Sequence, residues 1–580
     1  MRRSGDGARM RAGCRRGSMM FPACRSKVVS KRSFCCSAVL LFRSLPLIGV
    51  LSFAVCTGGA RAEEAAALFR HNRAASVASD SDGLPDSRAL RRSRLVFDPG
   101  VLAPPPFMRD LLARKLSKSV PDVSIAVGQA LEMELFPGEN MLFMVRRAEV
   151  GLDGVVTWIA KAVDDDFGET LISRKDGYLF ATVHKDGRIF QVRDGRNGQV
   201  FAEELDPTAF PAGNDDVVHA LGDSDKSASG TQKSQGAGGS RTVDVAVLYT
   251  QAVAQRQNIP VFVNNAAAEM NQSFINSGVD GSVRVVYYGL SSFVEPDDPP
   301  EMMDYTAFYQ AVTGMYYGVS EFSDLHGLRD DLRGDVVLLL TDASKATDVC
   351  GLGYVPLSVS GSPNRAYALT GDTCVTATRT FTHEIGHNIG AFHDKSLEEF
   401  EEDLLLSYSY GHSSVSPDFR TIMGSLPLTS CNMAGCPRIN YWSTPNLMHQ
   451  GIPIGHAADA DMARSHNEWI QVPAAYRTSG DPPPGMPSTV DVEPSYCYGI
   501  NLIMLGAGSG TVGWYEVQQS ASSSFSSPQE VFRGPQQPFT INVFGGSKWI
   551  RARACNSEGC SGWKAGDEPA IRTNCDPYDL

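Results

Sequence analysis

The first part of the chain alternates between short apolar segments and turn residues. Four segments rich in β-branched and aromatic residues lie at 141–150, 155–163, 178–183 and 188–192. Turn-forming sequences such as KDG and RNG separate them, as expected between strands. This pattern predicts a mostly antiparallel, β-rich domain over residues 63–240. Its end, residues 223–240, is rich in Gly, Ser and Gln and lacks apolar periodicity, which is typical of a flexible linker.

From residue 241 onward, strand patterns alternate with helix patterns. Strands are predicted at 242–250, 282–290, 335–342 and 366–372, and helices at 259–278, 325–334 and near 457–477. The alternation predicts an α/β domain over residues 241–478. A proline-rich linker follows at 481–489. Short strand patterns at 501–506, 511–520, 539–544 and 549–554 then predict an all-β sandwich over residues 488–580.

The first 62 residues differ from the rest in charge. They carry twelve Lys and Arg against one acid, whereas the remaining chain carries 40 Lys and Arg against 64 acids. The apolar run at 44–56 falls short of the roughly 20 residues that span a bilayer, and Ala60-Arg61-Ala62 offers a cleavage site. We therefore expect a signal peptide over 1–62 and a secreted protein, in the medium, the periplasm or at the cell surface, with no stable membrane insertion after cleavage. An uncleaved anchor is the alternative. The acidic body argues against nucleic-acid binding, which needs a basic face.

Cysteine usage is consistent with export. None of the 13 cysteines lies between residues 63 and 349. The cysteines beyond that gap are even in number, which predicts disulfides in an oxidising compartment; they are Cys350, Cys374, Cys431, Cys436, Cys497, Cys555, Cys560 and Cys575. Cys350 with Cys374, and Cys431 with Cys436, are candidate local pairs. The last four permit three connectivities, and none is preferred.

The segment THEIGHNIGAFHD, residues 382–394, holds three of the chain's 11 histidines. On a helix over 376–389, His383 and His387 lie one turn apart on the same face and can bind one ion. Gly390 can adopt positive φ and turn the chain, which brings His393 back as a third ligand. Three imidazoles with an open fourth position are typical of a catalytic zinc site, with one zinc ion per chain. Zinc would lower the pKa of a bound water, and Glu384 would accept its proton as the general base.

HEIGHNIGAFH matches the metzincin signature H-E-x-x-H-x-x-G-x-x-H. With Met423 in FRTIMGS and Asp394 after the third histidine, the chain resembles the reprolysin/adamalysin-like metzincins. CGLGY at 350–354, CPRINYWSTPN at 436–446 and residues 451–469 resemble the bacterial peptidyl-Asp metalloendopeptidases. The resemblance covers about residues 241–478. It implies a zinc endopeptidase with a mixed five-stranded sheet, in which Met423 supports the metal site and Asp394 fixes local geometry. Calcium is a further candidate ion, for which no ligands are assigned.

The resemblance also assigns roles to the flanking regions. Residues 63–240 are expected to be a propeptide, and since they lack cysteine, a propeptide thiol cannot hold the zinc. Latency would then use steric cover or a carboxylate. Arg438, soon after Met423, is the candidate for binding an acidic substrate side chain. Residues 488–580 resemble a bacterial fibronectin type III domain, for which an extracellular ligand is a candidate partner.

The overall prediction is a secreted zinc-dependent endopeptidase that is made as a zymogen and hydrolyses peptide bonds of protein or peptide substrates. A non-catalytic, zinc-bearing adhesion protein is the alternative, although the intact Glu384 argues against it. A host-directed toxin would share the chemistry and differ only in its target. The histidines that lack ligand spacing are predicted to be surface or core residues: His326, His412, His449, His456 and His466.

Overall fold

The computed structural model describes residues 65–72, 88–102, 127–194, 198–210, 216–218, 241–296, 305–342, 349–395, 406–416, 418–424, 436–477, 483–494, 500–506, 508–534, 539–542, 547–556 and 559–570. The predicted signal peptide and the predicted linker at 223–240 lie outside these ranges. Among the described residues, no helix combines the length and the apolar character that crossing a membrane requires.

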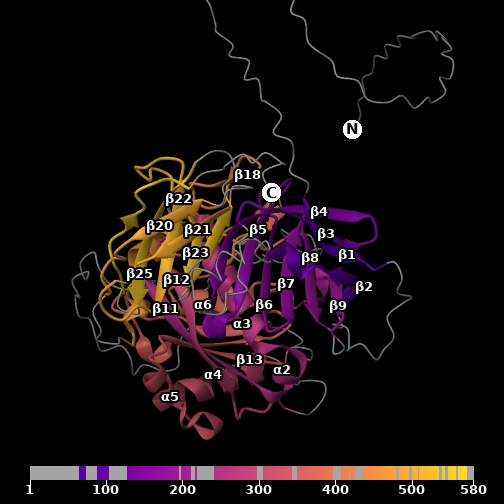
Figure 1. Cartoon of the computed structure of the whole chain (residues 1–580). Coiled ribbons are helices and arrows are strands. Elements are labelled where there is room, and N and C mark those ends of the chain that lie inside the picture. The colour runs from indigo at the N-terminus through magenta and orange to yellow at the C-terminus, as the bar shows by residue number, and fades with distance from the viewer. Residues whose placement is uncertain are drawn as a thin grey trace, which may run out of the picture. The chain divides into compact units, whose positions relative to one another are not determined.

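Residues 66–205 form a closed barrel of nine strands (Figure 1). The strands are β1 (Ala66–His71), β2 (Ala89–Phe97), β3 (Ala130–Phe136), β4 (Glu139–Val150), β5 (Val156–Ala162), β6 (Glu169–Lys175), β7 (Tyr178–Lys185), β8 (Arg188–Asp194) and β9 (Val200–Leu205). Their order is β4-β3-β1-β2-β9-β8-β7-β6-β5, and β5 pairs back to β4. The β-rich character was predicted. The closure was not, because alternation along single strands does not reveal which strands pair.

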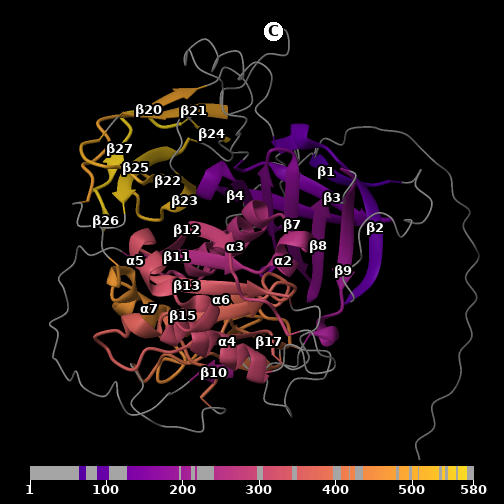
Figure 2. The same ribbon diagram turned by 90° about the horizontal axis from the view of Figure 1, so that it is seen from below.

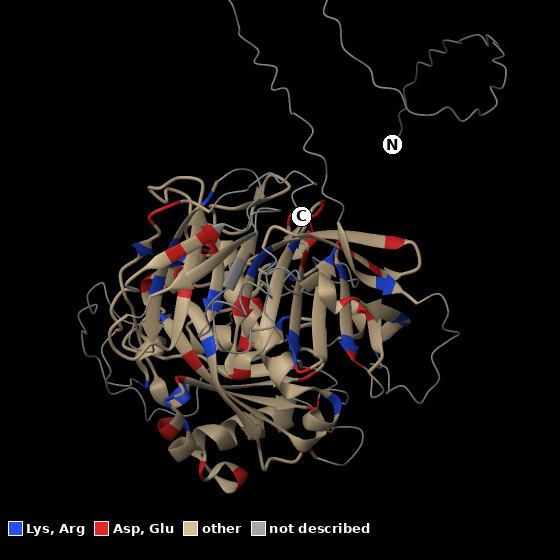
Figure 3. Cartoon of the chain, viewed as in Figure 1, with Lys and Arg blue, Asp and Glu red and all other residues tan. Residues whose placement is uncertain are grey.

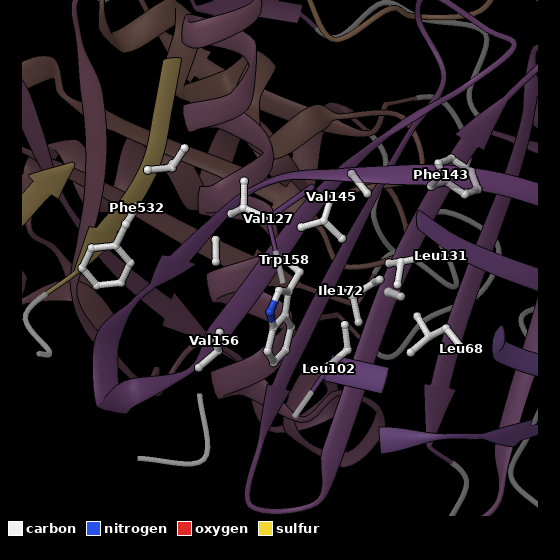
Figure 4. Close-up of a cluster of buried hydrophobic side chains, with 14 of the residues drawn as sticks. Leu68, Leu102, Val127, Leu131, Phe143, Val145, Val156, Trp158, Ile172 and Phe532 are labelled. Atoms are coloured by element: carbon white, nitrogen blue, oxygen red, sulfur yellow. The ribbon is translucent and has the colours of Figure 1, made fainter. Parts of the chain in front are cut away.

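The barrel interior is filled by large apolar side chains. Leu68, Leu131 and Phe143 are fully buried, and Trp158 is nearly so (Figure 4). Phe532, from the C-terminal region, extends this cluster. Basic and acidic residues are interspersed along the strands (Figure 3), for example where Arg91 and Arg188 both pair with Glu204. One hydrophobic core therefore spans the barrel and part of the C-terminal region.

The C-terminal region consists of two sheets. One contains β20 (Val490–Pro494), β21 (Ile500–Leu505) and β24 (Phe539–Asn542); the other contains β22 (Trp514–Ser520), β23 (Gln529–Gly534), β25 (Trp549–Asn556), β26 (Gly559–Cys560) and β27 (Lys564–Ala565). β23 pairs in parallel with β4, so the second sheet continues into the barrel sheet (Figure 2). The region is all-β, as predicted, and its strands also share hydrogen bonds with the N-terminal barrel.

The central sheet has six described strands in the order β10-β14-β15-β13-β11-β12. They are β10 (Asp216–Val218), β11 (Thr242–Tyr249), β12 (Ser282–Leu290), β13 (Val336–Thr341), β14 (Gly351–Tyr354) and β15 (Tyr367–Gly371). β14 runs antiparallel to β15, and the other pairs are parallel. Residues 241–478 contribute five of these strands in a mixed arrangement, and β10 adds a sixth. β10 comes from the segment before residue 241 and pairs with the otherwise open edge of β14.

Helices cover both faces of this sheet. They are α2 (Gln251–Arg256), α3 (Ile259–Ser277), α4 (Tyr305–Tyr317), α5 (Leu325–Leu332), α6 (Thr380–Asn388) and α7 (Met462–Trp469). Side chains of α3, α6 and α7 share one core, and side chains of α4 and α5 share another. As predicted, α3 ends at Gly278, which adopts φ 71°. The remaining strands are two short hairpins: β16 (Ser413–Val415) with β17 (Asp418–Arg420), and β18 (Met448–His449) with β19 (Ile452–Pro453).

Candidate metal centre

Helix α6 carries His383 and His387 and begins at Thr380, four residues later than predicted. The residue before it, Arg379, has left-handed backbone angles of φ 59° and ψ 29°. Such angles are uncommon for a residue other than glycine and stop the helix from extending upstream. Every residue of α6 is buried.

The structure brings His383, His387 and His393 together. One ring nitrogen from each lies within 4.8 Å of the other two, and the Nε2 atoms of His383 and His393 are 3.0 Å apart. Gly390 adopts φ 90°, which turns the chain after α6 and allows His393 to return. The predicted helix-and-turn geometry is therefore present.

Hydrogen bonds fix the orientation of two of these rings. Nδ1 of His383 lies 2.9 Å from the carbonyl oxygen of Ile422, and Nδ1 of His387 lies 2.9 Å from that of Ala391. Since a carbonyl only accepts, each Nδ1 donates its proton and each Nε2 keeps its lone pair. Burial, with a contribution from the charge of Arg438, holds the pKa of His383 well below its usual value. Neutral imidazole nitrogens that converge in this way suit a zinc ion.

Glu384 lies against strand β14. A Cβ atom on Gly351 would come within 2.5 Å of Glu384 Oε1, and one on Gly353 within 3.1 Å of Oε2. The carboxylate is fully buried. β14 can approach it this closely only because both facing positions are glycine.

Met423 packs against α6 at Gly386. A Cβ atom on Gly386 would come within 2.9 Å of Met423 Sδ and 3.1 Å of the Trp442 ring. Met423 is fully buried, and its segment turns through a hydrogen bond from Gly424 N to Thr421 O of 2.9 Å. Asp394 accepts a 2.6 Å hydrogen bond from Ser413 Oγ, which is compatible with its predicted role in local geometry.

Arg438 lies on a segment that is hydrogen-bonded to the metal site. Ile439 N donates to Arg420 O at 2.8 Å, and Ile422 N donates to Tyr441 O at 2.9 Å. Since the carbonyl of Ile422 also holds His383, the Arg438 segment and the metal ligand belong to one hydrogen-bonded unit. Arg438 itself is buried, and its Nη1 donates to Thr378 O at 2.8 Å.

A cavity of about 610 Å³ lies beside Arg438. Residues from the barrel and from the α/β region both line it, including Arg379, Arg420 and Asp418. Arg379 is not among the site residues predicted from the sequence, although its position four residues before His383 places it one helical turn from a ligand. Glu169, the barrel residue that pairs with Arg379, is not among them either.

The remaining histidines are mostly explained by packing. His466 is buried against Trp442, with ring centroids 4.5 Å apart, and burial lowers its pKa to about 3. His326 hydrogen-bonds to Met315 O, and His449 packs against Phe167. His412 and His456, which have no ligand spacing in the sequence, have ring centroids 4.7 Å apart.

Two predicted features of the cysteines can be compared with the structure. The Cys350–Cys374 disulfide is confirmed, and it joins the start of β14 to the segment before α6. Cys555 pairs with Cys560. Glu516 lies close to both sulfur atoms, but because the two cysteines form a disulfide, these three residues are not a metal site. Cys436 is disulfide-bonded, whereas Cys431, Cys497 and Cys575 lie outside the described residues.

Comparisons with known proteins find relatives of the region that carries these histidines. Residues 239–443 match the family described as metallo-peptidase family M12. A peptidyl-Asp metalloendopeptidase of Stenotrophomonas maltophilia is 28% identical over 385 residues, which cover 62% of this chain and 87% of the relative. One of Xanthomonas campestris is 27% identical and covers 52% of this chain and 68% of the relative. Metalloproteinase-II of Bacteroides fragilis matches with 11% identity and a TM-score of 0.29, over 49% of this chain and 85% of that one, which is too low to establish a shared fold.

Proposed function

Since the chain is a metalloendopeptidase with a domain of metallo-peptidase family M12, we propose that His383, His387 and His393 hold its zinc ion and that Glu384 is its general base. The convergence of three imidazoles on one point, beside a buried glutamate of the same helix, carries this proposal. Its substrates are proteins or peptides.

Zinc held by His383, His387 and His393 would supply a bound water of lowered pKa and a positive charge that polarises a peptide carbonyl. Glu384 accepts the proton from the attacking water and then gives it to the departing amine. The carbonyls of Ile422 and Ala391 hold two of the rings in the tautomer that presents Nε2. Met423 and Trp442 pack beneath Gly386 and keep α6 in place.

We further propose that the uncut chain is a zymogen in which the region before residue 241 covers the site. An extended peptide binds a sheet edge through main-chain hydrogen bonds, and without β10 the strand β14, beside Glu384, would form the edge of the sheet. The backbone of Asp216–Val218 already pairs with Leu352–Tyr354 of β14. This supports steric cover, which requires no propeptide cysteine.

Secretion, through a signal peptide over residues 1–62, also belongs to this proposal. It is supported by the basic, apolar N-terminus and by disulfide use in the rest of the chain. The names of the relatives suggest a preference for peptide bonds next to aspartate. The all-β C-terminal region would act as a binding or spacing module. No ligands are assigned to calcium.

A peptide-library digest with and without a chelator tests the proposal. We expect chelator-sensitive cleavage by the wild-type protein after the linker at 223–240 has been cut, and little cleavage by the uncut chain. Glu384→Gln should retain zinc, measured by metal analysis, and lose turnover. Undiminished turnover in Glu384→Gln, or a zinc-free wild-type protein that cleaves peptides, would rule out the assigned site.

A further inference from the structure

Arg379 is a buried cation that reaches from the metal helix into the barrel. Only 1% of its side chain is exposed. Its Nη2 donates to Glu169 Oε1 at 3.0 Å, and its Nη1 lies 3.0 Å from both His184 Nδ1 and the carbonyl oxygen of Arg438. Glu169 and His184 belong to the barrel strands β6 and β7. The proposed propeptide therefore supplies the carboxylate that neutralises an arginine of the α/β region.

The charge of Glu169 is well defined. Burial would raise the pKa of Glu169, but Lys161 and Arg379 outweigh it and lower the pKa to about 2. Glu269, on α3, lies 3.5 Å from the same guanidinium, and burial raises its pKa to about 8. At neutral pH Glu169 is thus the ionised partner of Arg379, and Glu269 is mostly protonated.

The surroundings of Arg379 also favour an acidic ligand. In the adjacent cavity of about 610 Å³, the α/β region contributes three arginines, Arg379, Arg420 and Arg438, against one acid, Asp418. The barrel contributes Lys185 and Arg188 against Asp165 and Asp186, which balance. Removal of the barrel would therefore leave a cavity with excess positive charge on the side that holds the metal ligands.

Arg379 is also tied directly to the metal site. His383 N donates to Arg379 O at 3.0 Å, and the left-handed backbone of Arg379 sets the start of α6. A residue with unfavourable backbone angles persists where the surroundings fix it, often at ligand-binding positions. The guanidinium is thus held at a fixed place relative to His383.

We infer that Arg379 is the specificity-determining residue that binds an acidic side chain of the substrate, and that Glu169 occupies this position until the barrel leaves. The inference rests on the proposed protease function and adds the recognition residue and its internal competitor. Arg438 contributes its carbonyl, which orients Arg379, and its charge. A guanidinium can bind a carboxylate through two parallel hydrogen bonds. The amide of a substrate Asn or Gln cannot accept both of them, so it cannot replace the carboxylate.

The test compares matched peptides that carry Asp or Asn, and Glu or Gln, beside the cleaved bond. We expect Arg379→Gln in the linker-cleaved protein to lower kcat/KM for acidic peptides about 10- to 100-fold, because hydrogen bonds to charged groups are lost. Cleavage of the amide peptides should stay within about threefold. Arg379→Lys should give an intermediate Asp/Asn ratio. Arg464→Gln removes the same charge from an exposed pair on α7 and should leave the ratio unchanged.

Glu169→Gln separates the competitor from the recognition residue. Once the linker is cut and the barrel has left, its Asp/Asn ratio should equal that of the wild type. While the barrel is still bound, activity should appear sooner than in the wild type, and N-acetyl-aspartate amide should accelerate activation of the wild type more than the asparagine amide does.

Three results would overturn the inference. The first is an unchanged Asp/Asn ratio in Arg379→Gln, and the second is an equal loss on both peptides with normal zinc content. The third is wild-type activation kinetics in Glu169→Gln. Chelator-sensitive cleavage of the amide peptides tests the protease function separately, so a failure of this inference can be distinguished from a failure of the proposed function.

Discussion

Replacing Gly386 by alanine should disturb the packing of α6 against Met423 and Trp442. The new Cβ atom would lie 2.9 Å from Met423 Sδ and 3.1 Å from the Trp442 ring, which is closer than ordinary van der Waals contact. Both neighbours are fully buried, so neither can move into solvent. Overpacking of this kind costs about 1–3 kcal/mol. The intrinsic preference of helices for alanine over glycine, about 1 kcal/mol, offsets only part of it.

The net loss should appear as a lower Tm, by about 2–4 °C for each kcal/mol in a domain of this size. Zinc affinity, measured by chelator competition, should fall with it, because Gly386 lies between His383 and His387. Met423→Ala in the same chain removes the atom that clashes. The double variant should therefore lose less stability than the sum of the two single variants.

Gly327→Ala is the matched control. Gly327 lies on α5, and a Cβ atom there would meet nothing within 4 Å. We expect it to be neutral or slightly stabilising. A wild-type Tm in Gly386→Ala would contradict the predicted overpacking. So would a double variant whose loss of stability equals the sum of the losses in Gly386→Ala and Met423→Ala.

Two further predictions concern Phe532 on β23 and Glu269 on α3. Phe532→Ala should lower the free energy of unfolding by about 3–5 kcal/mol, because Phe532 is buried in the core shared with the barrel. Limited proteolysis should then cut both regions faster, whereas the control Tyr178→Ala, at a residue 52% exposed, should not change their digestion. Unchanged digestion of the barrel in Phe532→Ala would contradict the shared core. Glu269 has its folded-state pKa raised to about 8 by burial, so folding takes up a proton, and its contribution to stability is lost as pH rises from about 4.5 to 8. Relative to wild type, Glu269→Gln should flatten the fall in Tm over this range; parallel curves for the two proteins would contradict this assignment.

Short-range features of the site follow from the sequence. The spacing of His383 and His387 puts both on one helix face, and Gly390 permits the turn to His393. Both features depend on residues within a few turns of one another, so local geometry is sufficient. The strand and helix patterns of the β-rich and α/β regions have the same origin, since they reflect periodicity along single elements.

The pairing of distant segments does not follow from the sequence. Barrel closure by β4 and β5, addition of β10 to the edge of β14, and continuation of the barrel sheet into β23 are set by which strand edges meet. The main-chain hydrogen bonds that join these strands are the same for almost every residue type. The periodicity of one strand therefore does not predict which other strand it pairs with.

The same contrast applies to the charges. The sequence determined that His383, His387 and His393 can hold one ion, because the helical repeat aligns the first two rings and the turn at Gly390 returns the third. Only the tertiary structure decided that Arg379 meets Glu169, which lies 210 residues away along the chain. A buried arginine acquires its partner from whatever packs against it, and here that is a strand of the barrel.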